Sequence, residues 1–147
     1  MQQTNHVALA RLEDIRAGTL PMPPMWANLA LGVGALASGA IEMTTQPEER
    51  HLNAFGGVHG GYIAAVLDTV LGLAIYTSIG PDDRHITVDL AVKLLKAPSV
   101  GVPLVATSAL VHVSRSVGVS QAWLRDAAGV LYAHGTTTCN IRRADAR

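Results

Sequence analysis

The sequence of 147 residues is poor in cysteine, in charge and in aromatic side chains. Its single cysteine, Cys139, cannot form an internal disulfide, and it cannot build a structural zinc site without several other ligands. Eleven basic and eleven acidic residues give a formal net charge of zero. Because nucleic acids and anionic membrane surfaces attract basic proteins, we expect neither a nucleic acid nor a membrane among the partners.

The chain also lacks a clear targeting or membrane-spanning segment. Residues 1–20 contain four charged side chains, which interrupt any signal-peptide core: Arg11, Glu13, Asp14 and Arg16. Residues 25–41 are uncharged but are broken by glycines, and residues 62–79 carry Asp68 in their middle. We therefore predict a cytoplasmic location.

The sequence is rich in apolar residues. Hydrophobic residues make up 49% and charged residues only 15%, and the mean hydropathy is +0.28. A chain of this length forms one domain, and this composition is unusually apolar for a small domain, so we expect part of the domain's surface to be buried against copies of itself. We divide the chain into an N-terminal helical segment, residues 1–30, and a single domain, residues 31–147.

The pattern of apolar residues and breakers predicts an α+β fold. We expect a short amphipathic helix at 6–17, a helical turn at 25–29, a strand at 36–46, a long buried helix at 62–79, and four further strands at 86–95, 102–115, 117–126 and 130–142. The long helix is expected to end with Gly80 in a left-handed C-cap, because Pro81 cannot continue it.

The four later strands are predicted to form a meander, because short turns join successive strands in an antiparallel manner. In the first of them, strict alternation places Val88, Leu90, Val92 and Leu94 on one face and Thr87 on the other. The long helix would pack on this sheet, whose open edges invite pairing with a second copy.

Asp68 is the first candidate for chemistry. A carboxylate in an apolar helix must be paired, protonated or facing a wet cavity. At the start of the same helix, Gly60 and Gly61 offer unpaired amides for a developing oxyanion and let a bulky acyl group approach. Gly60 and Asp68 are about 12 Å apart along the axis, so they can serve one carbonyl only across a two-fold axis.

The motif HxNxxGxxHGG followed by a helical Asp resembles the hotdog-fold acyl-CoA thioesterases, in particular the phenylacetate-pathway (PaaI-like) type. Its residues here are His51, Asn53, Gly56, His59, Gly60, Gly61 and Asp68, and the resemblance extends over about residues 35–141. It implies a long central helix wrapped by a curved antiparallel sheet of about five to six strands. It also implies hydrolysis of an acyl-CoA at the subunit interface of a homodimer or homotetramer. No metal or cofactor is implied, since coenzyme A is part of the substrate.

The resemblance also assigns roles. The Gly60 amide would polarise the thioester carbonyl, with Asn53 and His59 supporting that end. Asp68 would activate or hold the attacking water, or attack directly, and Thr87 would help to hold the water. The residues by themselves leave other readings open: Asn53 could stabilise a turn, His59 could cap the helix, and Thr87 could be an ordinary strand residue.

Further residues are candidates for substrate binding. Val58 and Gly61 flank the helix start, where the acyl group would enter. His112, Ser114 and Arg115 lie near a strand end at which the family tends to contact the phosphates of coenzyme A, and a clamp could combine Arg115 with Lys96, Arg142 or Arg143.

Two other functions remain open. A 3-hydroxyacyl thioester dehydratase on the same fold would use His59 with Asp68 to move a proton from carbon. A non-catalytic acyl-CoA-binding module would use Asp68 only to shape a pocket. The products separate the three functions, because only hydrolysis releases a free thiol.

Overall fold

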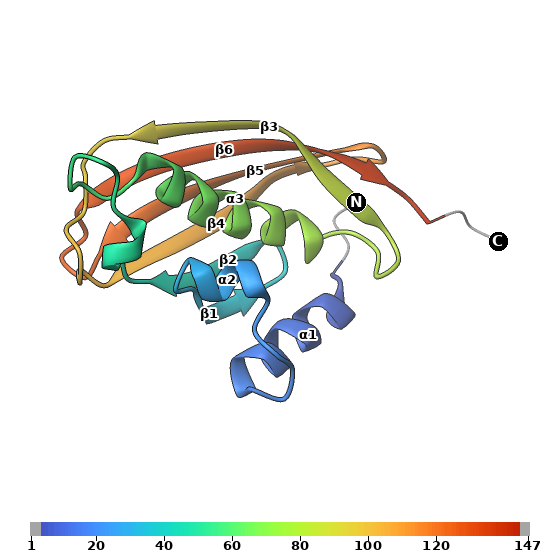
Figure 1. The fold of residues 1–147 in the computed structure, drawn as a ribbon. Coiled ribbons are helices and arrows are strands. Elements are labelled where there is room, and N and C mark those ends of the chain that lie inside the picture. Colours follow the sequence, from blue (N-terminus) through green and yellow to red (C-terminus); the bar gives the residue numbers. More distant parts are fainter. Residues whose placement is uncertain (1–3, 145–147) are drawn as a thin grey trace.

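The computed structural model describes residues 4–144 of the chain (Figure 1). Its elements in chain order are α1 (His6–Ala17), α2 (Pro24–Asn28), β1 (Gly32–Ala37), β2 (Ala40–Thr45), the 3-10 turn η1 (Glu49–His51), α3 (Gly60–Tyr76), β3 (Arg84–Leu94), β4 (Leu104–Val113), β5 (Val117–Asp126) and β6 (Leu131–Arg142).

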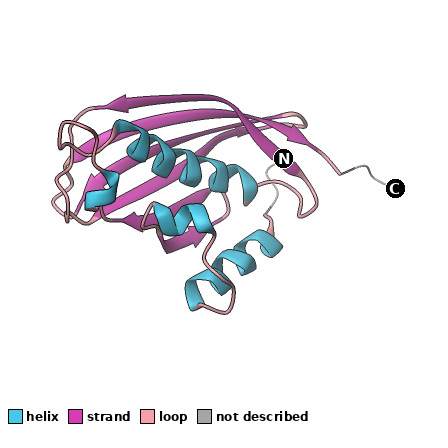
Figure 2. Cartoon of the chain, in the orientation of Figure 1, coloured by secondary structure: helices cyan, strands magenta, loops and turns pink. Residues whose placement is uncertain are grey.

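One six-stranded antiparallel sheet curves around α3, with the strand order β1-β2-β4-β5-β6-β3 (Figures 1 and 2). The apolar face of α3 lies against the sheet, and Val66, Leu67, Val70 and Leu71 are fully buried in the core. The predicted arrangement of a long helix wrapped by an antiparallel sheet is therefore confirmed. Within residues 4–144, no helix is both long and apolar enough to cross a membrane.

The segment predicted as one strand at 36–46 is a hairpin of two strands. Ala37 pairs with Ala40, and Gly39 adopts a left-handed φ of 74° in the turn between them. Because glycine tolerates positive φ without a Cβ clash, this tight reversal fits where a continuous strand was expected. Two strands, not one, precede the central helix.

The predicted meander is wrong for its first strand. β3 pairs with β6 at one edge of the sheet, while β4 lies between β2 and β5. Only β4, β5 and β6 follow one another as neighbours. The connection at 95–103 is long enough for the chain to cross the end of the sheet, so proximity in sequence did not require β3 and β4 to pair.

The C-terminal end of α3 also differs from the prediction. The helix ends at Tyr76, Thr77 is its right-handed C-cap, and Gly80 does not adopt a positive φ. The exposed carbonyls are instead satisfied by Asn5, which is 2% exposed. Its backbone N–H donates to Thr77 O (3.0 Å) and its side-chain amide to Tyr76 O (3.3 Å) and Gly80 O (3.4 Å). These bonds fasten the start of α1 to the end of α3.

Candidate active site

Asp68 lies in the middle of α3 with its side chain half-buried. The Thr87 hydroxyl on β3 donates a hydrogen bond to Asp68 Oδ1 at 3.2 Å. Thr87 Oγ1 is also 3.8 Å from the Sγ of Cys139, whose thiol has a pKa raised by burial. Because the thiol stays protonated, Cys139 is a poor nucleophile here. The structure thus brings together the two residues, Asp68 and Thr87, that were predicted to hold a water molecule.

A bulge in β3 is the reason that Thr87 faces α3. Thr87 pairs with Cys139, whereas Asp89 pairs with Thr138, so Val88 is the extra residue of the strand. Because of the bulge, Thr87 faces the helix on the same side of the strand as Leu90, Val92 and Leu94. Val88 does not face the helix. The strict alternation predicted for this strand is therefore wrong at one residue, the one that positions Thr87 beside Asp68.

A pocket of about 400 Å³ opens beside Asp68. It is lined by residues from three parts of the chain: Arg11 and Trp26 from the N-terminal helices, Asp68, Thr69, Gly72, Leu73 and Tyr76 from α3, and His85 and Thr87 from β3. The carboxylate therefore faces a cavity that can hold water, as a charged group in an apolar helix requires.

His85 is a site residue that the sequence predictions missed. It lies two residues before Thr87, so the strand periodicity places both side chains toward α3. Its ring is 6.1 Å from the ring of Tyr76, and a Cβ at Gly72 would come within 3.3 Å of its Nε2. Burial lowers the pKa of His85, and the nearby Asp68 carboxylate acts in the opposite direction. The signal that could have found it is this i, i+2 spacing from Thr87.

The lowered pKa of His85 predicts a stability that depends on pH. The unfolded histidine titrates near 6.5, so below that pH the unfolded chain binds a proton that the folded chain resists. The His85 contribution is fully present above about pH 6.5 and is lost as the pH falls through the folded pKa. The free energy of unfolding, measured by urea denaturation, falls between pH 7.5 and pH 5. We expect this fall to be smaller for His85→Gln than for the wild type. His112→Gln, which changes an exposed histidine, serves as the control, and equal losses for all three proteins would contradict the prediction.

The other end of the candidate site is the start of α3. His59 is the N-cap, and its Nδ1 accepts a hydrogen bond from the Gly61 N–H at 2.8 Å. A ring nitrogen that accepts a hydrogen bond carries no proton, so the proton of a neutral His59 is on Nε2. Among residues 4–144 no acceptor binds the Gly60 N–H. The structure therefore leaves this amide free at the positive end of a helix.

The loop before α3 is held by Asn53 and His51. Asn53 Oδ1 accepts hydrogen bonds from the N–H groups of Phe55 (2.9 Å) and Gly57 (3.1 Å), so this side chain stabilises the turn. His51 is buried and stacks on the Tyr62 ring at 4.1 Å, and both of its ring nitrogens are hydrogen-bonded to backbone groups. These contacts fix the path of the backbone into the helix start.

An apolar pocket of about 260 Å³ adjoins the Gly60 amide. Its lining comes from the start of α3 and the end of β3: Val58, Gly60, Ile63, Leu94, Leu95, Lys96 and Ala97. A Cβ at Gly60 would lie only 2.7 Å from Leu94 Cδ1, so a larger residue at this position would require the end of the Leu94 side chain to shift. Val58, a predicted substrate-binding residue, therefore lies next to the free amide.

The free Gly60 amide and the Asp68 carboxylate belong to one continuous helix. Eight residues of α3 separate them, about 12 Å along the axis. A base or nucleophile must lie about 3 Å from its target, so the two groups of one chain cannot act on the same carbonyl.

Comparison with known proteins identifies the family. A family model described as the thioesterase superfamily matches residues 55–133, which is more than half of the chain and includes Gly60, Asp68 and Thr87. The chain belongs to this superfamily. No curated protein matches it.

Solved structures show that the fold of this superfamily member is the hotdog fold. A phenylacetic acid degradation-related protein from Ralstonia eutropha is 24% identical, with a TM-score of 0.78 over 88% of this chain and 98% of that one. A thioesterase from Haemophilus influenzae is 20% identical, with a TM-score of 0.78 over 90% of each chain. A Streptococcus mutans protein bound to acetyl-CoA is 23% identical, with a TM-score of 0.70 over 76% of this chain and 88% of that one.

Three residues predicted to bind phosphate, His112, Ser114 and Arg115, do not line the Asp68 pocket of this thioesterase-superfamily chain. His112 pairs with Val119 on β5 and is exposed on the sheet face opposite α3. Ser114 and Arg115 form the β4–β5 turn, where the Ser114 hydroxyl accepts a hydrogen bond from the Val117 N–H (3.1 Å). Lys96, beyond the opposite end of β3, lies 5.6 Å above the Tyr132 ring. The structure separates Lys96 from Arg115, so those two cannot form one clamp within a chain.

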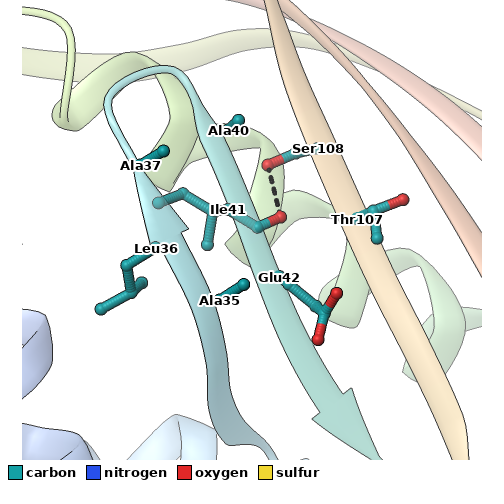
Figure 3. Close-up of a pocket in the computed structure, with 8 residues that line it drawn as sticks. All are labelled: Ala35, Leu36, Ala37, Ala40, Ile41, Glu42, Thr107 and Ser108. Carbon is teal, nitrogen blue, oxygen red and sulfur yellow. Dashed lines mark hydrogen bonds between the residues drawn. The ribbon is translucent and has the colours of Figure 1, made fainter.

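A further pocket, of about 260 Å³, lies on the β1–β2 hairpin and β4 (Figure 3). Its walls are mostly small and apolar side chains, and Ser108 donates to the Ile41 carbonyl at 3.3 Å. Glu42 is its one titratable lining residue. With no second ionisable group to work with Glu42, this pocket is not the candidate active site.

Proposed function

We propose that the chain is an acyl-CoA thioesterase that hydrolyses its substrate at the interface between two copies. One observation carries the proposal: α3 presents a free amide at Gly60 and a carboxylate at Asp68, bonded to Thr87 beside an open pocket, at a separation that only a second copy can close. An acyl transfer to water needs both an oxyanion donor and a water-activating base.

The edge strand β3 supports the pairing of two copies. One of its sides faces no other strand of the described residues 4–144, and its exposed apolar residues include Ile86 (60%), Val88 (63%) and Leu94 (53%). An open, apolar strand edge is a template for pairing with another chain. If two β3 strands pair antiparallel, the sheets continue into each other and the two α3 helices run in opposite directions. The Gly60 end of one helix then faces the Asp68 of the other.

The reaction follows from this arrangement. The thioester oxygen accepts a hydrogen bond from the Gly60 N–H of one protomer, which stabilises negative charge as it develops. Asp68 of the partner, held by its Thr87, takes a proton from water as the water oxygen bonds to the carbonyl carbon. The tetrahedral intermediate collapses, the carbon–sulfur bond breaks with its electron pair going to sulfur, and the departing thiolate takes up the proton that Asp68 removed from water, which restores the carboxylate. The products are a free acid and coenzyme A.

The acyl group would occupy the apolar pocket beside Gly60. Residues Val58, Ile63 and Leu94 offer no hydrogen-bonding side chain, so they suit a hydrocarbon or aryl group. The motif resembles the phenylacetate-pathway type, and the Ralstonia protein of the same fold is named for phenylacetic acid degradation. Phenylacetyl-CoA is therefore the first substrate to test.

The direct test is thiol release, followed with a chromogenic thiol reagent, from acetyl-, hexanoyl-, lauroyl-, benzoyl- and phenylacetyl-CoA. Release of coenzyme A supports the proposal and ranks the acyl groups. Formation of an enoyl thioester from a 3-hydroxyacyl-CoA without free thiol would favour a dehydratase. Binding of acyl-CoA without turnover of any substrate would favour a binding module.

A mixing experiment tests the location at the interface. We expect Gly60→Pro and Asp68→Asn each to be nearly inactive alone, whereas coexpression at equal levels restores about a quarter of wild-type activity. Half of the random dimers are mixed, and each mixed dimer holds one site with both groups intact. If the coexpressed proteins stay as inactive as the separate variants, the site is not shared between two chains, and the proposed location at the interface is wrong.

A further inference from the structure

Phe55, the only phenylalanine of the chain, is exposed to solvent. It is 96% exposed, the largest fraction among the large apolar residues between 4 and 144. Leu94 (53%) and Leu95 (59%) are exposed as well, and both line the pocket at the helix start that follows the loop of Phe55. Aromatic residues are enriched at protein–protein interfaces, where burial of the ring contributes much of the binding energy.

The turn that carries Phe55 is closed by hydrogen bonds. The N–H groups of Phe55 (2.9 Å) and Gly57 (3.1 Å) donate to Asn53 Oδ1, and the Asn53 N–H donates to the Gly57 carbonyl at 2.8 Å. Gly56 adopts a left-handed φ of 84°, which a side chain would disfavour. The backbone therefore holds the Phe55 ring out in one place, so a partner that covers the ring need not order the loop first.

The loop of Phe55 projects past the start of α3 (Figure 1). A bridge between Leu52 and Val58 joins its two ends, and the Val58 end leads into the helix at Gly60. Phe55 is in the middle of the loop. It therefore lies beyond Gly60, on the side away from Asp68 of its own chain.

The proposed dimer brings this loop over the partner. Gly60 of one α3 faces Asp68 of the other, and the two helices run in opposite directions. The chain before Gly60 therefore lies alongside residues that follow the partner's Asp68. Leu73 follows Asp68 by five residues, about 8 Å along the helix axis, and Phe55 precedes Gly60 by five. The loop of Phe55 thus lies alongside the partner's Leu73.

Leu73 and Trp26 form the apolar wall of the pocket beside Asp68. Each packs with one side against the core and is only half-buried within one chain. The remaining lining residues of this pocket are polar or glycine. An aromatic ring that comes from the partner therefore has one apolar surface to pack on there.

Trp26 belongs to a wall that is already fixed within one chain. Side chains of the domain donate to three successive carbonyl groups just after it, those of residues 27, 28 and 29. The donors are Arg50 (3.0 Å), His51 (2.7 Å) and Thr45 (2.7 Å), respectively. A wall held in this way loses little conformational entropy when a partner packs on it.

We propose that Phe55 of each protomer docks on Trp26 and Leu73 of its partner and closes the partner's Asp68 pocket toward solvent. The inference rests on the proposed function for the antiparallel arrangement of the two copies. It gives each chain a second contribution to the other's site, besides the Gly60 amide. Phe55 contacts no reacting atom in this arrangement. It is a positioning residue that excludes bulk water from the site.

The test measures how well acrylamide quenches the fluorescence of Trp26 in the assembled protein, so it needs no substrate. Trp123→Phe removes the other of the two tryptophans and serves as the parent protein. At concentrations where sedimentation shows a dimer, Phe55→Ser should raise the quenching constant about 2-fold or more, because no ring covers Trp26. It should also raise the dimer dissociation constant about 10- to 100-fold, the usual effect of truncating an interface hot spot.

Two matched variants of the same parent control this test. Val7→Ser removes an apolar side chain that is 61% exposed on α1, and Phe55→Tyr keeps the aromatic ring. Both should match the parent in quenching and in dimer dissociation. Because Phe55 is 96% exposed, Phe55→Ser is expected to fold like the parent. If it does not, Phe55→Gln takes its place and is judged in the same way.

The outcomes separate this inference from the proposed function. A rise in both constants for Phe55→Ser alone supports the docking, whether or not the protein hydrolyses a thioester. Unchanged quenching in the Phe55→Ser dimer overturns the docking, and the proposed function is retained if that dimer still releases coenzyme A. An equal change in Val7→Ser or Phe55→Tyr also overturns the docking, as does a parent protein that stays monomeric.

Discussion

Replacing Asp68 by asparagine is expected to lower kcat by about 10²–10⁴-fold, or about 3–5 kcal/mol of transition-state stabilisation. Asparagine has nearly the same shape, and its side-chain oxygen can still accept the Thr87 hydrogen bond of 3.2 Å. What it lacks is the ability to take a proton from water. The loss should therefore appear in kcat, with KM for the acyl-CoA little changed.

The measurement is steady-state thiol release by wild type and Asp68→Asn on the best acyl-CoA of the panel. Circular dichroism and the elution volume on size exclusion establish that the variant folds and assembles like the wild type. Asp14→Asn, which removes a carboxylate from the exposed side of α1, controls for the change in charge. A folded, assembled Asp68→Asn protein with full activity would exclude Asp68 as the base.

Replacing Gly60 by proline is expected to lower kcat by about 10²–10³-fold, because it deletes one oxyanion donor. Gly60 is the first residue of α3, where the fixed φ of proline fits a helix. His59, the preceding residue, has φ −66° and ψ 130°, a conformation that a following proline favours. The deleted N–H binds no acceptor in residues 4–144, so its loss should cost the fold little.

The proline also introduces a Cβ, and two controls separate that effect. Gly60→Ala keeps the N–H but brings a Cβ to within 2.7 Å of the flexible end of Leu94, so its activity reports the steric effect alone. Leu94→Ala combined with Gly60→Pro relieves the contact while the donor remains absent. The double variant should stay as inactive as Gly60→Pro. If it recovers wild-type activity, the loss was steric, and the Gly60 amide is not the oxyanion donor.

The helices of the fold could be predicted closely, because their signals are local. The range 6–17 agrees with α1, and the apolar run with glycines at its start gives α3 to within three residues at each end. The range 117–126 agrees with β5 for the same reason, since its alternation and its bounding turns lie within ten residues. Capping at the end of α3 was predicted wrongly because Asn5, which satisfies the last carbonyls, is more than seventy residues away.

The candidate site could be predicted only in part. Asp68 stands out because it is a carboxylate in an otherwise apolar helix, and Gly60 stands out because a glycine pair begins the same helix. Thr87 was chosen through the family resemblance, while the alternation placed it on the wrong face. His85 was missed because a histidine in a strand is unremarkable until its i, i+2 spacing from Thr87 is considered together with the pocket that both residues share with Asp68.

The sequence by itself determined the extents of α1 and β5, the presence of the long apolar helix, and the interval of about 12 Å between amide and carboxylate, because these follow from neighbours along the chain. Only the tertiary structure decided which strands pair, and that pairing sets which side chains lie opposite one another along the edge strand β3. Setting β3 beside β6 placed Arg84 opposite Arg142, and the bulge at Val88 turned Thr87 toward Asp68. Such contacts join residues that are distant along the chain, and their register depends on packing that no local pattern encodes.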